Sequence, residues 1–174
     1  AISDGMMYLG TSTGAYPYDV SQPANPQQAG FLPEMGRVQA MAASPAGAAY
    51  SSRNATYFVR RTGNEVRMVG ALTGRPATAL AMSGPYVYLG RGRLLEIASP
   101  EVTLPAEVGS CDCVSQNSLP TLDVAGGYAY IADYDAGLRI VDVSNPAAPV
   151  EVSVTDTPGR AFDVAVWNGR AYVA

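Results

Sequence analysis

The chain has 174 residues, of which 48% are hydrophobic and 15% charged, a composition typical of a globular protein that excludes wholesale disorder. Its 11 basic residues are all arginines, and with 15 acidic residues the net charge is −4, which disfavours nucleic acid as a partner. Histidine is absent, so Ser-His-Asp triads, histidine-based acid–base catalysis and most zinc sites are excluded.

Tyrosines recur along the chain at a nearly constant spacing. They are Tyr8, Tyr50, Tyr88, Tyr130 and Tyr172, with successive separations of 42, 38, 42 and 42 residues. Each follows a turn of glycine or small polar residues, so we expect each tyrosine on the second strand of a hairpin. The spacing predicts a structural repeat of about 42 residues within a single domain, 1–174.

The repeat divides the chain into units of approximately 1–38, 39–76, 77–119 and 120–161, with the start of a next unit at 162–174. The stretch Gly109–Ser118 is interpreted as an insertion, because it makes the third unit longer than the others. No stretch is apolar enough to span a membrane. The most apolar candidate, 38–50, is interrupted by Pro45 and Gly47.

The fourth unit carries four short segments with strand-like alternation, and none has a helical period. These segments are Leu122–Ala125, Tyr128–Ala132, Leu138–Val143 and Val150–Val154. Four-stranded antiparallel units of this length bury their faces against like neighbours, which predicts an all-β fold, a β-propeller. The residues expected in contacts between sheets are Tyr88, Tyr130, Val141, Val143, Val164 and Val166.

Three stretches resemble the LVIVD repeat family. They read Tyr130-Ile-Ala-Asp133, Gly137-Leu-Arg-Ile-Val-Asp-Val-Ser-Asn-Pro146 and Asp163-Val-Ala-Val166. The resemblance is specific over 120–174 and good over 2–32, where Asp19-Val-Ser-Gln-Pro23 repeats the motif. It implies a β-propeller and an extracellular or cell-surface location, since the family occurs largely in bacterial and archaeal surface or secreted proteins.

The two ends of the chain do not complement each other in the predicted repeat. The chain is expected to begin at the second strand of one unit and to end after the first two strands of another. We therefore expect a segment of a larger propeller, with unpaired edges at both ends.

The turn Asp133-Tyr-Asp135-Ala-Gly137 is the favoured binding site, through Asp133, Tyr134 and Asp135. An aromatic side chain in a polar loop is suited to contact with a protein or glycan. Its two carboxylates leave Ca²⁺ open as a ligand, but the 12-residue calcium-loop pattern is absent, so a polar turn is favoured over a metal site. No metal, cofactor or catalytic residue is expected.

Two cysteines and two aspartates are further candidates for a structural or functional role. Cys111 and Cys113 are expected either to form a disulfide or to remain as thiols, with the disulfide favoured. Asp123 and Asp163 are expected at the same place in successive units, as partners for turn amides or as lining of a polar channel. The structural role is favoured.

These observations favour a non-catalytic binding or scaffolding module outside the cytoplasm, with a protein or glycan partner. One alternative is an enzyme that holds a divalent metal on the propeller axis through Asp123 and Asp163. The other is a subunit of a cell-surface assembly, in which another chain completes the exposed edges.

Overall fold

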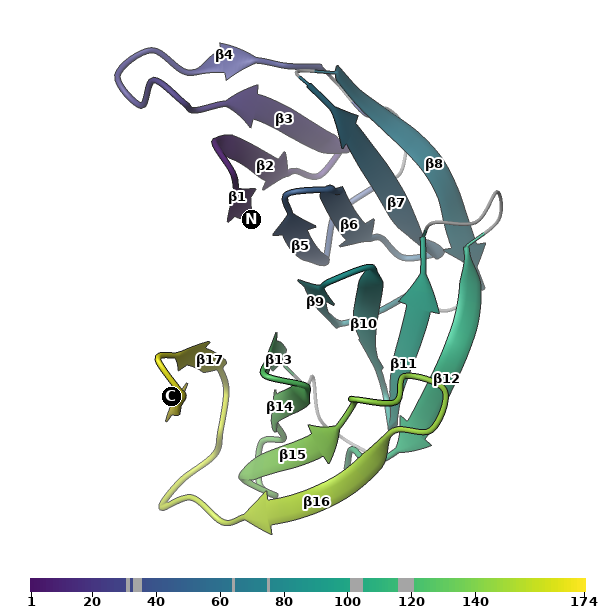
Figure 1. The fold of residues 1–174 in the computed structure, drawn as a ribbon, viewed down its shortest axis with the longest axis vertical. Coiled ribbons are helices and arrows are strands. Elements are labelled where there is room, and N and C mark those ends of the chain that lie inside the picture. Colours follow the sequence, from purple (N-terminus) through teal and green to yellow (C-terminus); the bar gives the residue numbers. More distant parts are fainter. Residues whose placement is uncertain (31, 33–35, 64, 75, 101–104, 116–120) are drawn as a thin grey trace. The chain divides into compact units, whose positions relative to one another are not determined.

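The computed structural model describes residues 1–30, 32, 36–63, 65–74, 76–100, 105–115 and 121–174 (Figure 1). Every regular element in these ranges is a β-strand, so the predicted all-β fold is confirmed. Accordingly, the described ranges contain no helix that could cross a membrane. The strands form two compact units, one of residues 1–77 with 100–106 and one of residues 78–99 with 107–174.

The first compact unit contains two four-stranded antiparallel sheets whose strand order follows the chain. One sheet consists of β1 (Ile2–Ser3), β2 (Met6–Gly10), β3 (Ala15–Asp19) and β4 (Gln27–Gln28), and the other of β5 (Ala40–Ser44), β6 (Gly47–Ser51), β7 (Ala55–Thr62) and β8 (Glu65–Thr73). Met6, Tyr8, Tyr50 and Val59 share one buried cluster.

The expectation that the chain begins at a second strand is wrong. Ile2 and Ser3 pair with Met7 and Met6, so the first sheet has a short first strand, β1. Two residues show no alternation pattern, which is why the sequence alone did not reveal this strand.

The second compact unit contains two further four-stranded sheets and one hairpin. Their strands are β9 (Ala79–Ser83), β10 (Tyr86–Arg91), β11 (Leu94–Ser99) and β12 (Ala106–Asp112), then β13 (Thr121–Ala125), β14 (Tyr128–Ala132), β15 (Leu138–Asp142) and β16 (Val150–Thr155), and last β17 (Val164–Trp167) and β18 (Arg170–Val173). The four strands predicted for residues 122–154 are confirmed, each boundary to within one residue.

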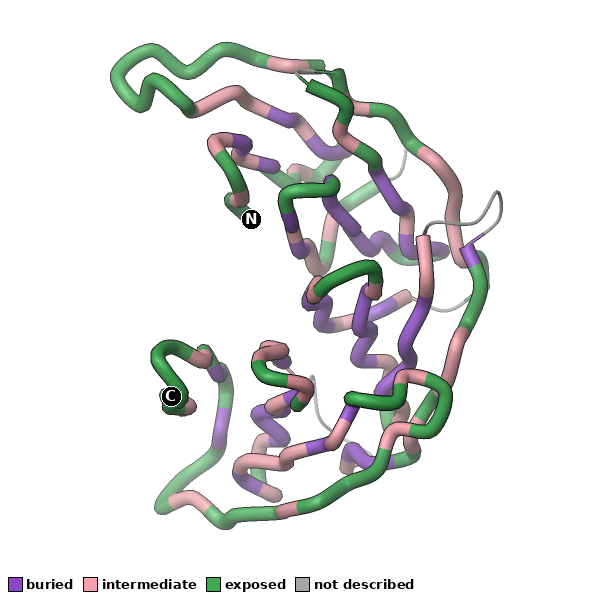
Figure 2. Tube along the Cα trace, in the orientation of Figure 1, coloured by how far each residue is buried: buried purple, intermediate pink, exposed green. Residues whose placement is uncertain are grey.

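The buried residues of the sheet β13–β16 lie in its three inner strands, whereas the outer strand β16 is mostly exposed (Figure 2). Ile131 and Val141 join the cluster that contains Tyr88, Leu95 and Ile97 of the preceding sheet. On the other face, Tyr130 packs with residues of the β17–β18 hairpin, including Val164. Successive residues of β14 point to opposite faces, so this strand serves two interfaces at once.

Most of the expected core is buried. Tyr88, Val141, Val143 and Val164 are buried, whereas Tyr130 and Val166 are half-buried. Tyr130 packs against the β17–β18 hairpin and Val166 belongs to it, and this hairpin has only two strands and therefore buries less apolar surface.

The proposed insertion Gly109–Ser118 is not a simple loop. Residues 109–112 belong to the outer strand β12, and Cys113 and Val114 are buried in the core, while 116–118 lie outside the described residues. Gly109 lies against the backbone of Pro146, and a Cβ added there would be 2.3 Å from the Pro146 carbonyl oxygen. The missing side chain lets the turn after β15 approach this strand.

Val141→Ala is expected to lower the free energy of unfolding by about 1–3 kcal/mol, because it removes fully buried methyl groups and leaves a small cavity. Urea denaturation measures this change. Val152→Ala on β16 is the matched control, since Val152 is exposed and should change stability by less than about 0.5 kcal/mol. Equal losses of stability at the two positions would contradict the observation that Val141 is buried and Val152 is exposed.

Alkaline pH is expected to destabilise the fold through its buried tyrosines. Burial raises the pKa of the Tyr8, Tyr50 and Tyr88 hydroxyls above the ordinary value. Unfolded tyrosine ionises near pH 10, so above this pH the unfolded state has lost protons that the folded state still holds. The melting temperature should therefore be nearly constant from pH 8 to 9 and fall above about pH 10. Tyr88→Phe should make the fall of the melting temperature above pH 10 less steep. If this variant lost stability with pH as steeply as the unmodified chain, burial of the Tyr88 hydroxyl would not be a cause of the alkaline destabilisation.

Candidate functional site

The turn after β15 is fixed by short-range hydrogen bonds. The Asp142 carboxylate accepts hydrogen bonds from the backbone amide and the hydroxyl of Ser144, at 2.9 and 2.6 Å. These bonds lower the pKa of the Asp142 carboxyl. The next amide, of Val143, donates to the carbonyl of Gly127 at 2.9 Å. The turn is thereby tied to the β13–β14 hairpin.

The same arrangement occurs in the first sheet. Asp19 accepts the Ser21 amide at 2.9 Å, and the Val20 amide donates to the carbonyl of Gly5 at 2.7 Å. The Asp-Val-Ser motif therefore has the same structural role in both sheets. It ends the third strand and holds the following turn against the hairpin of the first two strands.

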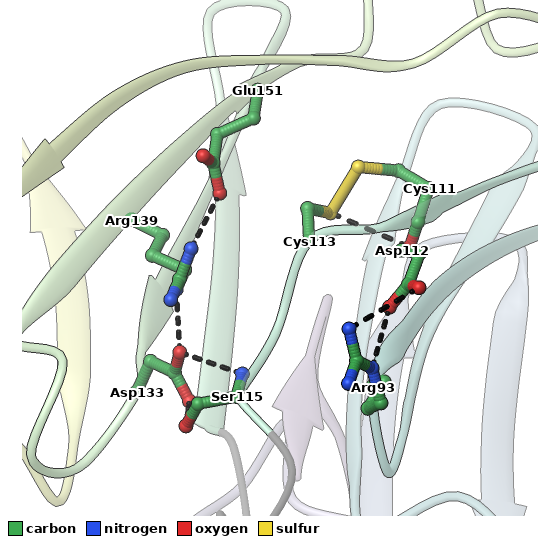
Figure 3. The surroundings of a disulfide bond; sticks show 8 residues. All are labelled: Arg93, Cys111, Asp112, Cys113, Ser115, Asp133, Arg139 and Glu151. Carbon is green, nitrogen blue, oxygen red and sulfur yellow. Dashed lines mark hydrogen bonds and ion pairs between the residues drawn. A yellow bond between two sulfur atoms is a disulfide. The ribbon is translucent and has the colours of Figure 1, made fainter.

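Asp133 is fully buried and joins two neighbouring sheets (Figure 3). One of its carboxylate oxygens accepts the Ser115 amide at 2.9 Å and the other accepts the Ser115 hydroxyl at 2.8 Å. Arg139 Nε donates to the same carboxylate, while Arg139 Nη1 donates to Glu151 at 2.8 Å. Partial burial lowers the pKa of Arg139, but hydrogen bonds and charge interactions with Glu151 and Asp133 raise it overall.

This network gives the predicted binding residue Asp133 a structural role. Both of its carboxylate oxygens are engaged within the protein and neither faces solvent, which leaves the carboxylate poorly suited to an external ligand. Its position fixes the start of the turn that presents Tyr134 and Asp135.

A pair of backbone hydrogen bonds holds the turn against the segment before β17. The amides of Tyr134 and Ala161 each donate to the other residue's carbonyl, both at 3.0 Å. Tyr134 has a left-handed backbone with φ of 50°, and Gly137 closes the turn with φ of 74°. The bridge brings the neighbours of Ala161, Arg160 and Phe162, beside the turn.

Tyr134, Asp135, Arg160 and Phe162 form a surface group that we call the Tyr134 cluster. Arg160 donates to the Asp135 carboxylate and to the Tyr134 hydroxyl, both at 2.8 Å, and its guanidinium carbon lies 4.5 Å from the centroid of the Tyr134 ring. The Phe162 ring meets Tyr134 edge to face with centroids 5.0 Å apart. The hydrogen bond and charge of Asp135 raise the pKa of Arg160. Phe162 is 60% exposed.

A shallow pocket of about 250 Å³ adjoins this cluster. Its lining residues are Thr157, Pro158, Gly159, Arg160, Ala161, Val173 and Ala174. Arg160 and Phe162 could not be recognised as site residues from the sequence. Arg160 is 25 residues from Asp135 in the chain, and no motif links the two segments, so only the fold brings them together.

Asp123 and Asp163 both lie where the chain enters the inner strand, but the hairpins that follow them differ in length. Asp123 lies opposite Tyr130 on its hairpin, but Ala165 lies opposite Tyr172. Asp163 is thus two residues farther from its turn, because the β17–β18 hairpin extends farther beyond its Asp-Val-Ala motif.

Both aspartates interact with backbone amides. Asp123 accepts the amides of Val124 and Val166, at 2.8 and 2.7 Å, and so links β13 to β17. Asp163 accepts the amide of Val164 at 2.9 Å. These contacts support the structural role for the two aspartates. The described residues contain no group of three or more Cys, Asp or Glu side chains arranged to hold a metal ion.

Cys111 and Cys113 form a disulfide, so the favoured alternative for these residues is the one observed. Figure 3 shows it next to the Ser115–Asp133 contact. Cys113 is buried in the core between the two sheets. The disulfide therefore lies at the base of the segment that reaches Asp133.

The family model that describes the LVIVD repeat matches residues 120–157. The chain carries an LVIVD repeat. This repeat comprises the sheet β13–β16, the buried Asp133 and the Asp142 turn, and it ends just before Arg160. A comparison with curated proteins finds no match.

Two solved structures are similar to the whole chain. The computationally designed protein Ika8 has a TM-score of 0.78 at 11% identity, over 99% of this chain and 53% of Ika8. Sqt1 of Chaetomium thermophilum, bound to the N-terminus of ribosomal protein L10, has a TM-score of 0.70 at 18% identity, over 92% of this chain and 48% of Sqt1. The chain spans about half the length of each. The fold around the LVIVD repeat is a β-propeller, as the sequence predicted.

Proposed function

We propose that this chain is a non-catalytic binding module that works outside the cytoplasm and contacts a protein partner through the Tyr134 cluster. The LVIVD repeat and the propeller fold support a binding or scaffolding role. We choose this surface because Arg160 stacks on Tyr134 beside the exposed side chain of Phe162. Tyrosine and arginine are the residues most enriched among those that dominate binding energy at protein interfaces.

The Tyr134 cluster is already ordered before a partner arrives. Asp135 holds the Arg160 guanidinium from one side, and the backbone bridge to Ala161 fixes Tyr134. Little side-chain freedom remains to be lost on binding, which favours affinity. The adjoining pocket offers room for one side chain of a partner.

A protein partner is favoured over a glycan because Arg160 and Asp135 already neutralise each other, and the remaining exposed surface of the cluster is aromatic. Sqt1 is a propeller whose structure contains a protein segment, the N-terminus of ribosomal protein L10. A peptide segment is accordingly the occupant that we propose for this surface. The disulfide Cys111–Cys113 supports a location in an oxidising compartment.

Arg160→Ala is expected to weaken binding about tenfold or more, because it removes both the charge and the group that orders Tyr134. A displayed library of 12-residue peptides and a glycan array serve as probes. Binders are selected on the unmodified chain and their dissociation constants are then measured by surface plasmon resonance on each variant.

Arg53→Ala is the matched control, since Arg53 is an exposed arginine of the first compact unit. Binders that lose affinity for Arg160→Ala and Phe162→Ala but not for Arg53→Ala would support the proposal. Peptide binders unaffected by both cluster variants would refute this choice of surface, and binders found only on the glycan array would refute the protein partner. Circular dichroism checks that each variant is folded.

A further inference from the structure

The disulfide Cys111–Cys113 lies where the outer strand β12 ends, and a single residue separates the two cysteines. Their Cα atoms are 5.3 Å apart. In an extended strand, the Cα and Cβ atoms of residues i and i+2 are about 6.6 Å apart, whereas a disulfide needs its Cβ atoms within about 4.5 Å. The bond is therefore incompatible with a continued strand and requires the chain to bend at Asp112, the last residue of β12.

The bend directs the chain toward the sheet β13–β16. The Val114 amide donates to the carbonyl of Arg93 at 3.1 Å, and the Val114 side chain is buried in the core cluster that both sheets share. The next residue, Ser115, donates its amide and its hydroxyl to the buried Asp133 carboxylate. Figure 3 shows the disulfide beside this contact. We call residues 111–115 the crossing segment.

The disulfide acts on the crossing segment more than on the stability of the whole chain. The stabilisation that a disulfide gains from loop closure grows with the number of residues it encloses, and this one encloses a single residue. The ion pair of Arg93 with Asp112 at the bend is 49% and 59% exposed, so it holds the bend only weakly. The covalent bond is accordingly the main local constraint that keeps the chain bent at Asp112.

We propose that the two cysteines form a redox switch for the Tyr134 cluster, an inference that rests on the function proposed above. In the disulfide form, the bend holds Ser115 on Asp133, and Asp133 fixes the start of the turn that presents Tyr134. In the dithiol form, the chain at Asp112 is free to extend. Ser115 then leaves Asp133 more often, and the turn loses one of its supports. The oxidised chain is the form that binds.

Thiol–disulfide exchange with a small-molecule disulfide, such as oxidised glutathione, closes the ring. Cys111 is half-buried and Cys113 only 4% exposed, so Cys111 is the residue that an external reagent reaches first. Its thiolate attacks one sulfur of the reagent and expels a thiol, and the Cys113 thiolate then attacks the Cys111 sulfur and expels the second thiol. The two protein thiols lose two electrons and two protons, which the reagent gains. An external dithiol reverses both steps.

Hydrogen exchange followed by NMR tests the switch without any ligand. The sequence has two cysteines, so dithiothreitol acts on this pair alone, and alkylation with mass spectrometry confirms that both thiols are free. In the dithiol form, the Ser115 amide should exchange about tenfold faster or more, because local opening of the crossing segment becomes easier. The amides of β6, in the first compact unit, should keep their rates. Unchanged exchange at Ser115, or a disulfide that dithiothreitol cannot reduce in the folded chain, would overturn the proposal.

Two variants on β12 control this experiment. Cys111→Ser cannot close the ring and leaves Cys113 in the core, so it should show the fast Ser115 exchange with or without dithiothreitol. Ser110→Ala changes the exposed neighbour of Cys111 and keeps both cysteines, so it should respond to dithiothreitol like the unmodified chain. Slow exchange at Ser115 in Cys111→Ser would show that the disulfide is not what holds the contact. Circular dichroism checks that both variants are folded.

Peptide binding connects the switch to the Tyr134 cluster. Binders selected on the oxidised chain should have a dissociation constant about tenfold higher or more for the dithiol form, because fewer molecules then hold the binding arrangement. Binders that lose affinity for Arg160→Ala but bind both redox forms equally would uphold the proposed function and refute the switch. If no binder depends on Arg160, the proposed function fails, while the exchange of the Ser115 amide still decides whether the disulfide controls its contact with Asp133.

Discussion

Asp133→Ala is expected to lower the free energy of unfolding by about 3–5 kcal/mol, one of the two largest effects of any substitution considered. The change removes a fully buried carboxylate that accepts two hydrogen bonds from Ser115 and one from Arg139. It leaves the Ser115 amide and part of the Arg139 guanidinium without their acceptor. Urea denaturation followed by circular dichroism measures the loss.

Asp135→Ala is the matched control for this experiment. Asp135 lies two residues later in the same turn and is exposed, and its solvent-exposed ion pair with Arg160 should contribute little to stability. Asp133→Asn should give an intermediate loss, because the amide keeps an acceptor oxygen but not the charge. A loss of less than about 1 kcal/mol for Asp133→Ala would contradict the structural role of this residue.

Gly137→Ala is expected to destabilise the chain by roughly 2–5 kcal/mol. The glycine has φ of 74°, a conformation that costs an alanine about 1–2 kcal/mol. A Cβ at this position would also lie 2.3 Å from the Thr155 carbonyl oxygen, so the backbone of the turn would have to move. The midpoint of thermal unfolding measures the effect, and peptide binding at the Tyr134 cluster should weaken with it.

Gly126→Ala separates the cost of the left-handed backbone from the cost of the close contact with Thr155. Gly126 has a similar φ of 60°, but a Cβ there meets no atom within 4 Å. It should therefore show only the backbone cost, about 1–2 kcal/mol. If Gly126→Ala and Gly137→Ala destabilised equally, close packing against Thr155 would not be the reason for a glycine at position 137.

The strands could be predicted from the sequence because their signals are local. Over residues 122–154, alternating apolar residues and turn-forming residues placed each boundary to within one residue, and the motif around Asp142 marked the turn after β15. Strand alternation and turn chemistry depend on neighbouring residues alone. The two-residue strand β1 and the outer strand β12 were missed because neither shows a regular alternation of its own.

The candidate site could be predicted only in part. The turn of residues 133–137 was correctly placed between two strands, and Tyr134 and Asp135 reach the surface there. The burial of Asp133 depends on Ser115, which lies in the segment after β12, the outer strand of the preceding sheet. The partners of Tyr134, Arg160 and Phe162, come from the segment before β17.

The sequence by itself determined the repeat, the all-β fold and the turns, because the tyrosine spacing reflects a unit that recurs along the chain and the Asp-Val-Ser motifs make their contacts within one turn. Only the tertiary structure decided which polar residues are buried and which are presented to a partner. Asp133 and Asp135 have the same chemistry and lie in the same turn, yet one joins two sheets and the other faces solvent. The difference arises because packing of one sheet on another brings together residues far apart in the chain, and no local pattern encodes that pairing.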